Sequence, residues 1–168
     1  TAKKPLILSG GGVRYSGAEQ TLADFAERCG IPIAETIAGK GGVVHNHSAY
    51  VGPMGIEGTD AAKTLAEGAD VILAIGTRLQ DFTTGSWTTF ARDARFVNIN
   101  TARFDAGKHR SVPVIGDALV TLQEISVALG DWSCPPSHMQ TAQALYADWN
   151  KELDKGQAPT NAETPSYA

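Results

Sequence analysis

Short apolar runs alternate with longer amphipathic segments along most of this chain, which predicts an α/β protein. Runs rich in β-branched and other apolar residues occur at 6–8, 31–34, 70–75, 95–100 and 111–115. Runs this short are typical of strands in a parallel sheet that is buried on both faces. The intervening segments carry apolar residues every three or four positions, as helices do. We therefore expect βαβ units around a mainly parallel sheet.

Amphipathic spacing predicts the helices and their ends. Residues 18–29 place their apolar side chains on one stripe, with Ser16 as the expected N-cap and Gly30 as the stop. Further helices are expected over Asp60–Glu67, over 118–129, and in the segment that contains Ala142, Leu145, Tyr146, Trp149 and Leu153. The glycine-rich stretch 39–58 has no regular period, and we expect it to be mostly loop.

The same pattern divides the chain. Residues 1–130 are expected to form the α/β domain, and 131–155 a linker with a C-terminal helix. Residues 156–168 are expected to be an extended or disordered tail. Since the chain begins with Thr1 rather than Met, we expect it to be a piece of a longer protein.

Charge and composition narrow the partners that we expect. The 168 residues carry 14 Lys and Arg against 18 Asp and Glu, a net charge of −4, so no basic surface for nucleic acid is expected. The longest apolar run, Val71–Ile75, is far shorter than the roughly 18 residues of a membrane span. Cys29 and Cys134 form no CxxC pair, which argues against a disulfide framework or zinc ribbon and favours a cytoplasmic location.

A glycine cluster, Gly10, Gly11 and Gly12, lies between the first expected strand and the following helix. Bare backbone N–H groups at such a junction can bind an anion such as a phosphate. The spacing differs from the GxGxxG fingerprint of dinucleotide-binding proteins. A tight turn that requires close backbone approach explains the same residues equally well, so both interpretations stay open.

Two further groups are expected at the same edge of the sheet. Residues 76–78 follow the central strand, where open α/β sheets bind ligands, and Arg78 could hold a phosphate. A salt bridge from Arg78 to Asp81 is the alternative. Asn98 and Asn100 lie two positions apart on one strand and so share a face. Their amides could meet a ribose hydroxyl or cap a following turn.

Other polar residues have simpler interpretations. His45 and His47 lack a third ligand nearby, so loop hydrogen bonding is favoured over a metal site. Residues 83–90 form either a loop that touches a hydroxylated ligand or another domain, or a helix start with Trp87 and Phe90 packed inward. No nucleophile with a matching base is indicated. A solvated surface is expected for the basic group Arg92, Arg95, Arg103, Lys108, His109 and Arg110.

Taken in order, several phrases of the sequence resemble the central domain of thiamine-diphosphate-dependent enzymes of the acetolactate synthase type. They lie between residues 4 and 130, at 10–13, 16–18, 30–33, 39–41, 52–55, 69–78 and 116–118. Within this family, residues 76–90 and 98–100 look most like the hydrolase branch that opens trihydroxycyclohexanedione in myo-inositol catabolism. The resemblance implies a Rossmann-like three-layer sandwich with a mainly parallel six-stranded sheet.

The resemblance also implies what the chain lacks. In the family, thiamine diphosphate and Mg²⁺ are held by two outer domains between neighbouring subunits. The Gly-Asp-Gly signature of the diphosphate-binding domain is missing here, because Gly116 and Asp117 are followed by Ala118. The chain alone is therefore expected to be inactive, with no catalytic or metal-binding residue. Its expected partners are the flanking domains and, in the full-length protein, further subunits of a dimer or tetramer.

Site residues follow from the same resemblance. The positions implied for a cofactor are Gly10, Gly11, Gly12, Gly76, Thr77, Arg78, Asn98, Asn100 and Asp117. Flavin-binding relatives have two acidic residues where this chain has Asn98 and Asn100, which argues against FAD or ADP here. The positions implied for the substrate side are Met54, Gln80, Asp81 and Trp87.

The functional hypothesis is the central domain of a thiamine-diphosphate-dependent hydrolase that opens a cyclic 1,2-diketone. One alternative is the central domain of an acetolactate synthase or a related decarboxylase. The other is a stand-alone module that binds ADP or FAD.

Overall fold

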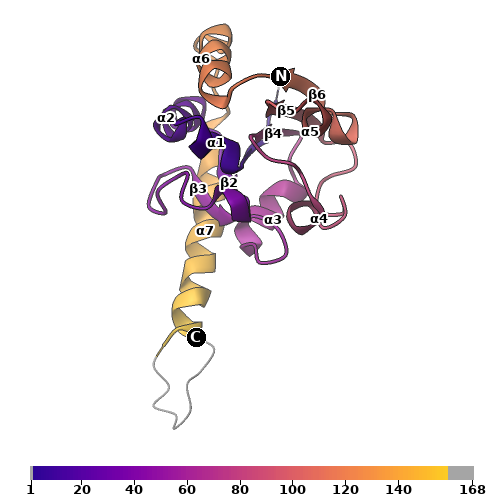
Figure 1. The fold of residues 1–168 in the computed structure, drawn as a ribbon. Coiled ribbons are helices and arrows are strands. Elements are labelled where there is room, and N and C mark those ends of the chain that lie inside the picture. Colours follow the sequence, from indigo (N-terminus) through magenta and orange to yellow (C-terminus); the bar gives the residue numbers. More distant parts are fainter. Residues whose placement is uncertain (1, 159–168) are drawn as a thin grey trace.

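Strands and helices alternate along residues 2–158, which the computed structural model describes (Figure 1). The strands are β1 (Pro5–Ser9), β2 (Ile33–Glu35), β3 (Tyr50–Pro53), β4 (Val71–Ile75), β5 (Arg95–Asn100) and β6 (Val112–Ile115). The α-helices are α1 (Gly11–Tyr15), α2 (Glu19–Cys29), α3 (Asp60–Glu67), α4 (Asp81–Thr84), α5 (Arg103–Ala106), α6 (Ala118–Leu129) and α7 (Pro136–Gly156). Two 3₁₀ turns, η1 (Ile37–Gly39) and η2 (Lys108–Arg110), complete the order.

The six strands form one parallel sheet in the order β3-β2-β1-β4-β5-β6. The expected parallel six-stranded sheet is thus confirmed. The strand order reverses between β1 and β4, which pair from Pro5 opposite Val71 to Ser9 opposite Ile75. The connections that leave these two strands run in opposite directions, and such a switch point leaves a crevice at the carboxyl edge of the sheet.

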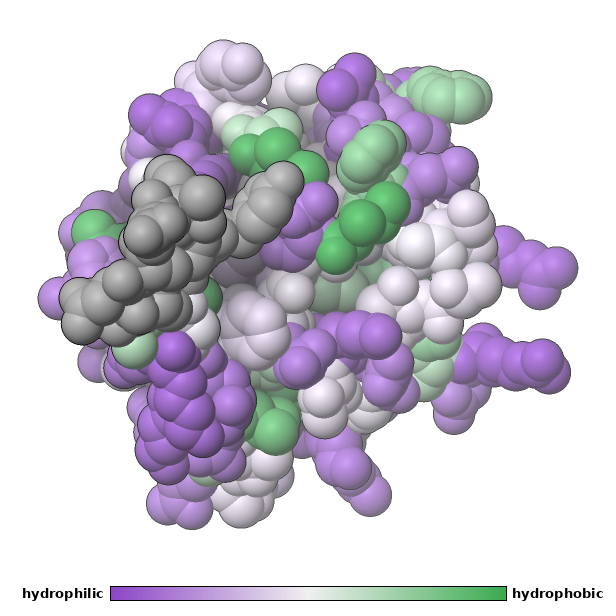
Figure 2. All heavy atoms as spheres, turned by 90° about the horizontal axis from the view of Figure 1, so that it is seen from below, coloured by the Kyte–Doolittle hydropathy of each residue, from purple (hydrophilic) through white to green (hydrophobic). Residues whose placement is uncertain are grey.

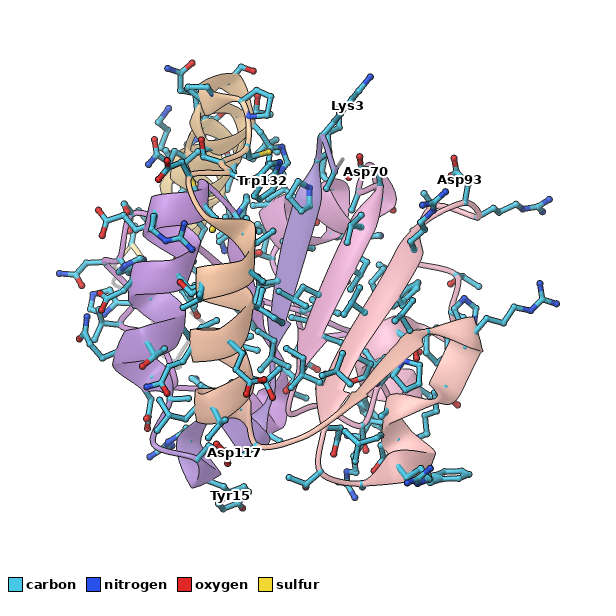
Figure 3. The ribbon with its side chains drawn as sticks, turned by 90° about the horizontal axis from the view of Figure 1, so that it is seen from above. Lys3, Tyr15, Asp70, Asp93, Asp117 and Trp132 are labelled. Atoms are coloured by element: carbon cyan, nitrogen blue, oxygen red, sulfur yellow. The ribbon has the colours of Figure 1, made fainter. Side chains whose placement is uncertain are left out.

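Alternating residues of the central strands supply two separate hydrophobic cores. In β1, Ile7 packs in the core that contains residues of α2 and α6, whereas Leu6 and Leu8 pack in the core that contains residues of α3 and α7. Figure 3 shows α2 and α6 side by side on one face of the sheet. Because both faces are covered, β4 and all of β1 except Ser9 are apolar, and the three-layer prediction is confirmed.

Helix α7 is longer than the sequence pattern indicated. It begins at Pro136, where a missing N–H is tolerated in the first turn. Ala142 is buried in the core beside α3, and the Tyr146 ring meets the Tyr50 ring edge-on at 5.6 Å between centroids. The C-terminal part of α7 extends beyond the sheet (Figure 1). Of the expected tail, Gly156 ends this helix, and residues 159–168 lie outside the described residues.

The junction after β1 differs from the prediction. Ser16 does not cap the next helix, because the chain first forms the short helix α1 and then turns at Gly17, whose φ is +61°. Ala18 precedes α2, and the Ser16 hydroxyl instead donates to Asp117 Oδ2 at 2.6 Å. The predicted stop at Gly30 is confirmed, with a left-handed φ of +67°.

Strand β3 lies inside the stretch that was expected to be mostly loop. It spans only four residues, Tyr50–Pro53, and contains Gly52 at φ +94° and a proline, so strand propensity does not reveal it. Pairing with β2 on the edge of the sheet stabilises it instead. Gly52 also lies against Thr59, the N-cap of α3, so that β3 is held to the helix that follows it.

Hydrophilic side chains dominate the face of the molecule drawn in Figure 2, where hydrophobic ones gather in a short band between them. Within residues 2–158, no helix combines the length and apolar character that crossing a membrane would require.

Candidate functional site

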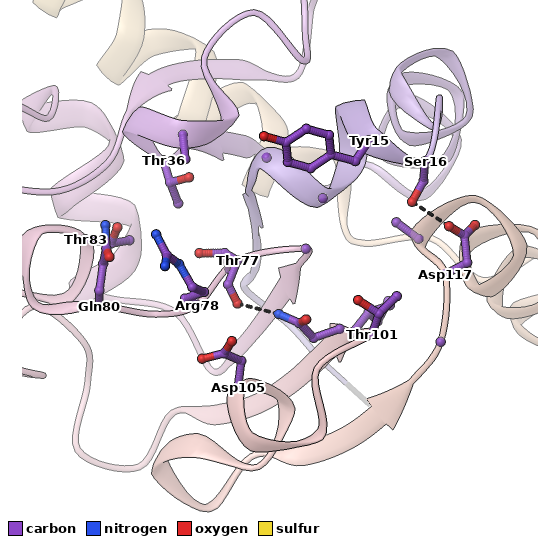
Figure 4. A pocket seen from close by; sticks show the side chains of 18 of the residues that line it. Tyr15, Ser16, Thr36, Thr77, Arg78, Gln80, Thr83, Thr101, Asp105 and Asp117 are labelled. Atoms are coloured by element: carbon purple, nitrogen blue, oxygen red, sulfur yellow. Dashed lines mark hydrogen bonds between the residues drawn. The ribbon is translucent and has the colours of Figure 1, made fainter.

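A pocket of about 610 Å³ lies at the carboxyl edge of the sheet, at the switch point between β1 and β4. Its walls come from the loops after β1, β2, β4, β5 and β6, and Figure 4 shows the side chains that line it. Figure 3 places Tyr15 and Asp117 at this edge and Lys3 and Asp70 at the opposite one. This volume lies in the range of small-molecule sites, and the position is the one where open α/β sheets bind ligands.

The predicted glycine cluster forms a close backbone contact with Gly76 at the base of this pocket. A Cβ on Gly12 would lie 2.6 Å from the Cα of Gly76, and a Cβ on Gly10 would lie 2.6 Å from the Cβ of Thr77. Gly76 has a φ of +60°, which favours glycine. The close backbone approach of the tight-turn interpretation is therefore present, although none of Gly10–Gly12 has a positive φ, and the anion site stays a prediction. Gly11 and Gly12 also line the pocket.

Arg78 is exposed and lies among Thr36, Thr77 and Gln80 on one side of the pocket (Figure 4). The alternative salt bridge to Asp81 is wrong for the described residues, which contain no ion pair of Arg78. Its backbone carbonyl accepts a hydrogen bond of 2.7 Å from Lys108 Nζ, which also pairs with Asp105 at 2.6 Å. The guanidinium group thus extends from a fixed backbone without a carboxylate partner among residues 2–158.

Both asparagines of β5 make side-chain hydrogen bonds to the backbone of this domain. Asn100 Nδ2 donates to the Thr77 carbonyl at 3.0 Å, and its Oδ1 accepts from Ala102 N at 2.9 Å, so it caps the following turn as one interpretation predicted. Asn98 is fully buried and donates to the Asp105 carbonyl at 2.8 Å. Its Oδ1 is buried without a hydrogen-bond partner among residues 2–158, and Asn98 does not line the pocket. Only Asn100 reaches the ligand edge.

Asp117 closes the pocket at the start of α6. Its Oδ1 accepts from the N–H groups of Leu119 and Val120, and its Oδ2 accepts from the Ser16 hydroxyl. The pKa of Asp117 is lowered, chiefly by the Ser16 hydrogen bond. The carboxylate therefore caps α6 and joins it to the end of α1.

Gln80, Asp81 and Trp87, which the resemblance marked for the substrate side, line a second recess of about 620 Å³. Leu79 and Phe82 lie on the same side as Gln80 and Asp81, and Lys108 and His109 of η2 form the other wall. The Trp87 and His109 rings stack at 3.9 Å with an interplanar angle of 10°. Treating Lys108 as part of a solvated surface was therefore wrong, because it is half-buried and bridges two loops. His109 is exposed as predicted, although its ring packs on Trp87.

The segment 83–90 combines features of both of its interpretations. Thr83 and Thr84 are buried at the end of α4, and Phe90 and Trp87 pack on Phe96 of β5, as the inward-packed interpretation predicted. Trp87 is only half-buried, so part of it also lines the second recess. Met54, the fourth substrate-side position, is buried in the core beside α3 and lines neither space.

Left-handed backbone concentrates around the second recess. The non-glycine residues with positive φ in the described part of the chain are Leu79, Ser86, Trp87, His109 and Arg110. Each such residue costs on the order of 1–3 kcal/mol, and it persists only where its surroundings hold it. Strain of this kind often accompanies ligand sites. No hydrophobic period or glycine signal marks these positions in the sequence.

The histidines and cysteines are used in packing and loops. His47 Nδ1 accepts from Ala49 N at 3.2 Å, consistent with the loop interpretation. Residues 2–158 contain no group of three or more His, Cys, Asp or Glu side chains that could hold a metal ion. Cys29 and Cys134 are free and buried, and burial raises the pKa of both thiols.

A buried carboxylate, Glu35 at the end of β2, was not anticipated. Its Oε1 accepts from Val43 N at 2.8 Å and its Oε2 from Gly41 N at 3.3 Å. Burial is the largest cause that raises the pKa of the Tyr50 phenol. The negative charge of Glu35 and a hydrogen bond to this carboxylate raise it further. Glu35 thus fixes the glycine-rich loop beside the pocket. In the sequence, the position of Glu35 directly after the apolar run 31–34 could have indicated a carboxylate at the end of a buried strand.

The comparisons with known proteins agree with this geometry. Residues 1–125 match the model of the family described as "Thiamine pyrophosphate enzyme, central domain". A 3D-(3,5/4)-trihydroxycyclohexane-1,2-dione hydrolase of Bacillus subtilis (strain 168) is 47% identical over 156 residues, which cover 92% of this chain and 24% of the relative. The hydrolase of the same name from Geobacillus thermodenitrificans (strain NG80-2) is 43% identical over 153 residues, or 91% of this chain and 24% of the relative.

A third relative with this name, from Clostridium perfringens (strain 13 / Type A), is 37% identical over 154 residues, again 91% of this chain and 24% of the relative. The chain thus spans about a quarter of the length of these relatives. With the Rossmann-like sheet and its ligand edge, the family match shows that this chain belongs to the thiamine pyrophosphate enzyme family and forms its central domain.

Proposed function

We propose that this chain is the central domain of a hydrolase that opens the ring of 3D-(3,5/4)-trihydroxycyclohexane-1,2-dione in myo-inositol catabolism. The observation that carries the proposal is the 47% identity to a curated hydrolase of that name across 92% of this chain. The loop after β4 also supports it, because it supplies Gln80 to both spaces at the carboxyl edge.

In this proposal the domain contributes packing, subunit contacts and one wall of the substrate channel. The domain proper covers residues 1–130, and 131–155 connect it through α7. Residues 156–168 lead to the domain that binds the cofactor diphosphate. The second recess supports the channel wall, because it joins the substrate-side positions Gln80, Asp81 and Trp87 on an open surface.

Residues 2–158 do not fit thiamine diphosphate or Mg²⁺. Asp117, the acidic residue at the matching Gly-Asp phrase, is occupied as the cap of α6 and by the Ser16 hydroxyl. The described residues also lack a cluster of metal ligands. We therefore assign both groups to the flanking domains of a full-length homo-oligomer, a dimer or tetramer in the cytoplasm.

Turnover assays on the full-length protein test this function. Ring opening of the trihydroxycyclohexanedione should be observed in the presence of thiamine diphosphate and Mg²⁺. The 168-residue chain alone should show no turnover under the same conditions. Pyruvate condensation without diketone hydrolysis would contradict the proposal and favour the acetolactate synthase or decarboxylase alternative.

For the first pocket, the proposal excludes FAD and ADP as bound cofactors. Its size and the exposed Arg78 favour a nucleotide, but asparagines stand at the acidic positions of flavin-binding relatives, so no carboxylate accepts ribose hydroxyls there. Asn98 is buried behind α5, and the Asn100 amide already bonds to Thr77 and Ala102. Calorimetric titration with FAD and ADP should show no micromolar binding, whereas binding that Arg78→Ala abolishes would contradict this.

A further inference from the structure

The second recess contains polar side chains that the packing of the domain does not use. Gln80 and Asp81 come from the loop after β4, and His109 comes from the turn after α5. Within residues 2–158, none of these three side chains makes a hydrogen bond or an ion pair. Their groups are therefore available to a ligand that enters the recess.

The position of His109 is set by its neighbours. Its ring lies flat on Trp87 at 3.9 Å, and the edge of Phe96 meets it at 5.2 Å with an angle of 85°. The adjacent Lys108 ties η2 to the loop after β4 through the Arg78 carbonyl at 2.7 Å and to Asp105 at 2.6 Å. Both Trp87 and His109 have left-handed backbone, so the stacked pair rests on two constrained loops.

The available groups indicate the chemistry of the ligand. An amide and an imidazole can each donate and accept a hydrogen bond, and a carboxylate accepts. Asp81 disfavours an anion, and Lys108, although paired with Asp105, disfavours a cation. Hydroxyl groups satisfy all three side chains, because a hydroxyl both donates and accepts. The exposed Phe82 ring suits the apolar face of a ring, whereas the Trp87 ring is already covered by His109.

We propose that His109, held against Trp87, is a specificity-determining residue that hydrogen-bonds a ring hydroxyl of the diketone substrate, while Gln80 and Asp81 bind neighbouring hydroxyls. This inference rests on the proposed function, since it assigns the substrate of that reaction to this recess. It adds a residue from η2, a segment whose basic character alone indicated only a solvated surface. His109 acts through binding and takes no part in bond cleavage.

The test compares kcat and KM for ring opening of the trihydroxycyclohexanedione by the full-length enzyme and three variants. His109→Phe keeps an aromatic ring on Trp87 and removes the hydrogen-bonding nitrogens. Gln80→Leu removes the amide on the opposite loop with little change in volume. His45→Phe is the matched control, because His45 is an exposed histidine that lines neither the pocket nor the recess.

We expect KM to rise about fivefold in His109→Phe and in Gln80→Leu, with kcat within about twofold of the wild type. The control should match the wild type. If His109→Phe does not fold, as judged by circular dichroism, His109→Leu takes its place, because it also removes the hydrogen-bonding nitrogens of residue 109. Unchanged KM in the folded variants, or a fall in kcat alone, overturns the inference and leaves the proposed function intact. A wild-type enzyme that condenses pyruvate but does not hydrolyse the diketone overturns both.

Discussion

The contact between Gly12 and Gly76 predicts the relative stability of three glycine-to-alanine variants. Gly17 has a φ of +61° and open space around it, so an added Cβ meets nothing within 4 Å. Gly12 lies in helix α1, where alanine is tolerated, but its Cβ would lie 2.6 Å from Gly76 Cα. Gly76 combines both problems, because its φ is +60° and its Cβ would lie 2.5 Å from Gly12 Cα.

The magnitudes follow from these two causes. A left-handed backbone costs an L-residue roughly 1–2 kcal/mol, and alanine recovers part of this by restricting the unfolded chain. We therefore expect Gly17→Ala to lose about 1 kcal/mol. Overpacking against backbone costs about 1–3 kcal/mol, so Gly12→Ala should lose about 2 kcal/mol and Gly76→Ala about 3–4 kcal/mol. The last value is a large part of the roughly 5–15 kcal/mol of a typical domain.

Urea unfolding of the 168-residue chain, followed by circular dichroism, measures these free energies. The m-value should stay constant across the series, so that shifts of the midpoint report stability. A Gly76→Ala variant that is no less stable than Gly17→Ala would contradict this explanation. In that case the two turns would have room to separate, and the close approach would not be what requires glycine at position 76.

Three further measurements test the structure. Glu35→Gln should lower the free energy of unfolding, measured in urea, by about 1–3 kcal/mol, because an NH₂ group replaces one of the two carboxylate oxygens that accept backbone N–H groups. The control Glu67→Gln, at an exposed position, should leave it unchanged. Burial raises the pKa of Asp70, but the backbone N–H groups of residues 3 and 4 lower it more, so its net pKa lies below 3.8. The stabilisation by ionised Asp70 is fully present above its unfolded-state pKa and is lost as pH falls through its folded-state pKa. The difference in free energy of unfolding between wild type and Asp70→Asn should therefore shrink below about pH 4 and then vanish. A difference that stays constant with pH would contradict this. Ellman's reagent at pH 8 should react slowly with native Cys29 and Cys134, whose thiol pKa values burial raises, and rapidly in urea; equal rates would show that the thiols are exposed.

Elements with a strong local signal could be predicted from the sequence. Val71–Ile75 is a continuous apolar run, and it forms the strand beside β1. Asp60–Glu67 begins after a threonine cap and ends before glycine, and it is a helix with these bounds. Strand β3 could not be predicted in the same way, because four residues with a glycine and a proline depend on pairing with β2.

The candidate site was also predicted from the sequence only in part. The turns after β1 and β4 were predicted at the ligand edge, since parallel strands bring their carboxyl ends together. The stack of His109 on Trp87 joins two loops that are separated by a strand and a helix, and no periodic pattern records such a contact. Burial of Asn98 behind α5 was also hidden, because strand spacing gives the face of a side chain and not what covers it.

Strands β1 and β4 are neighbours in the sheet but distant in the chain. Lys4 N bonds to Asp70 Oδ1 across 66 positions, and the two strands pair immediately beyond this contact. A ribosome adds about 5–20 residues each second, so β1 is synthesised several seconds before β4. During that interval the edge of β1 that will bind β4 has no partner from this chain. The central pairing of the sheet therefore cannot form during synthesis until residue 75 has left the ribosome.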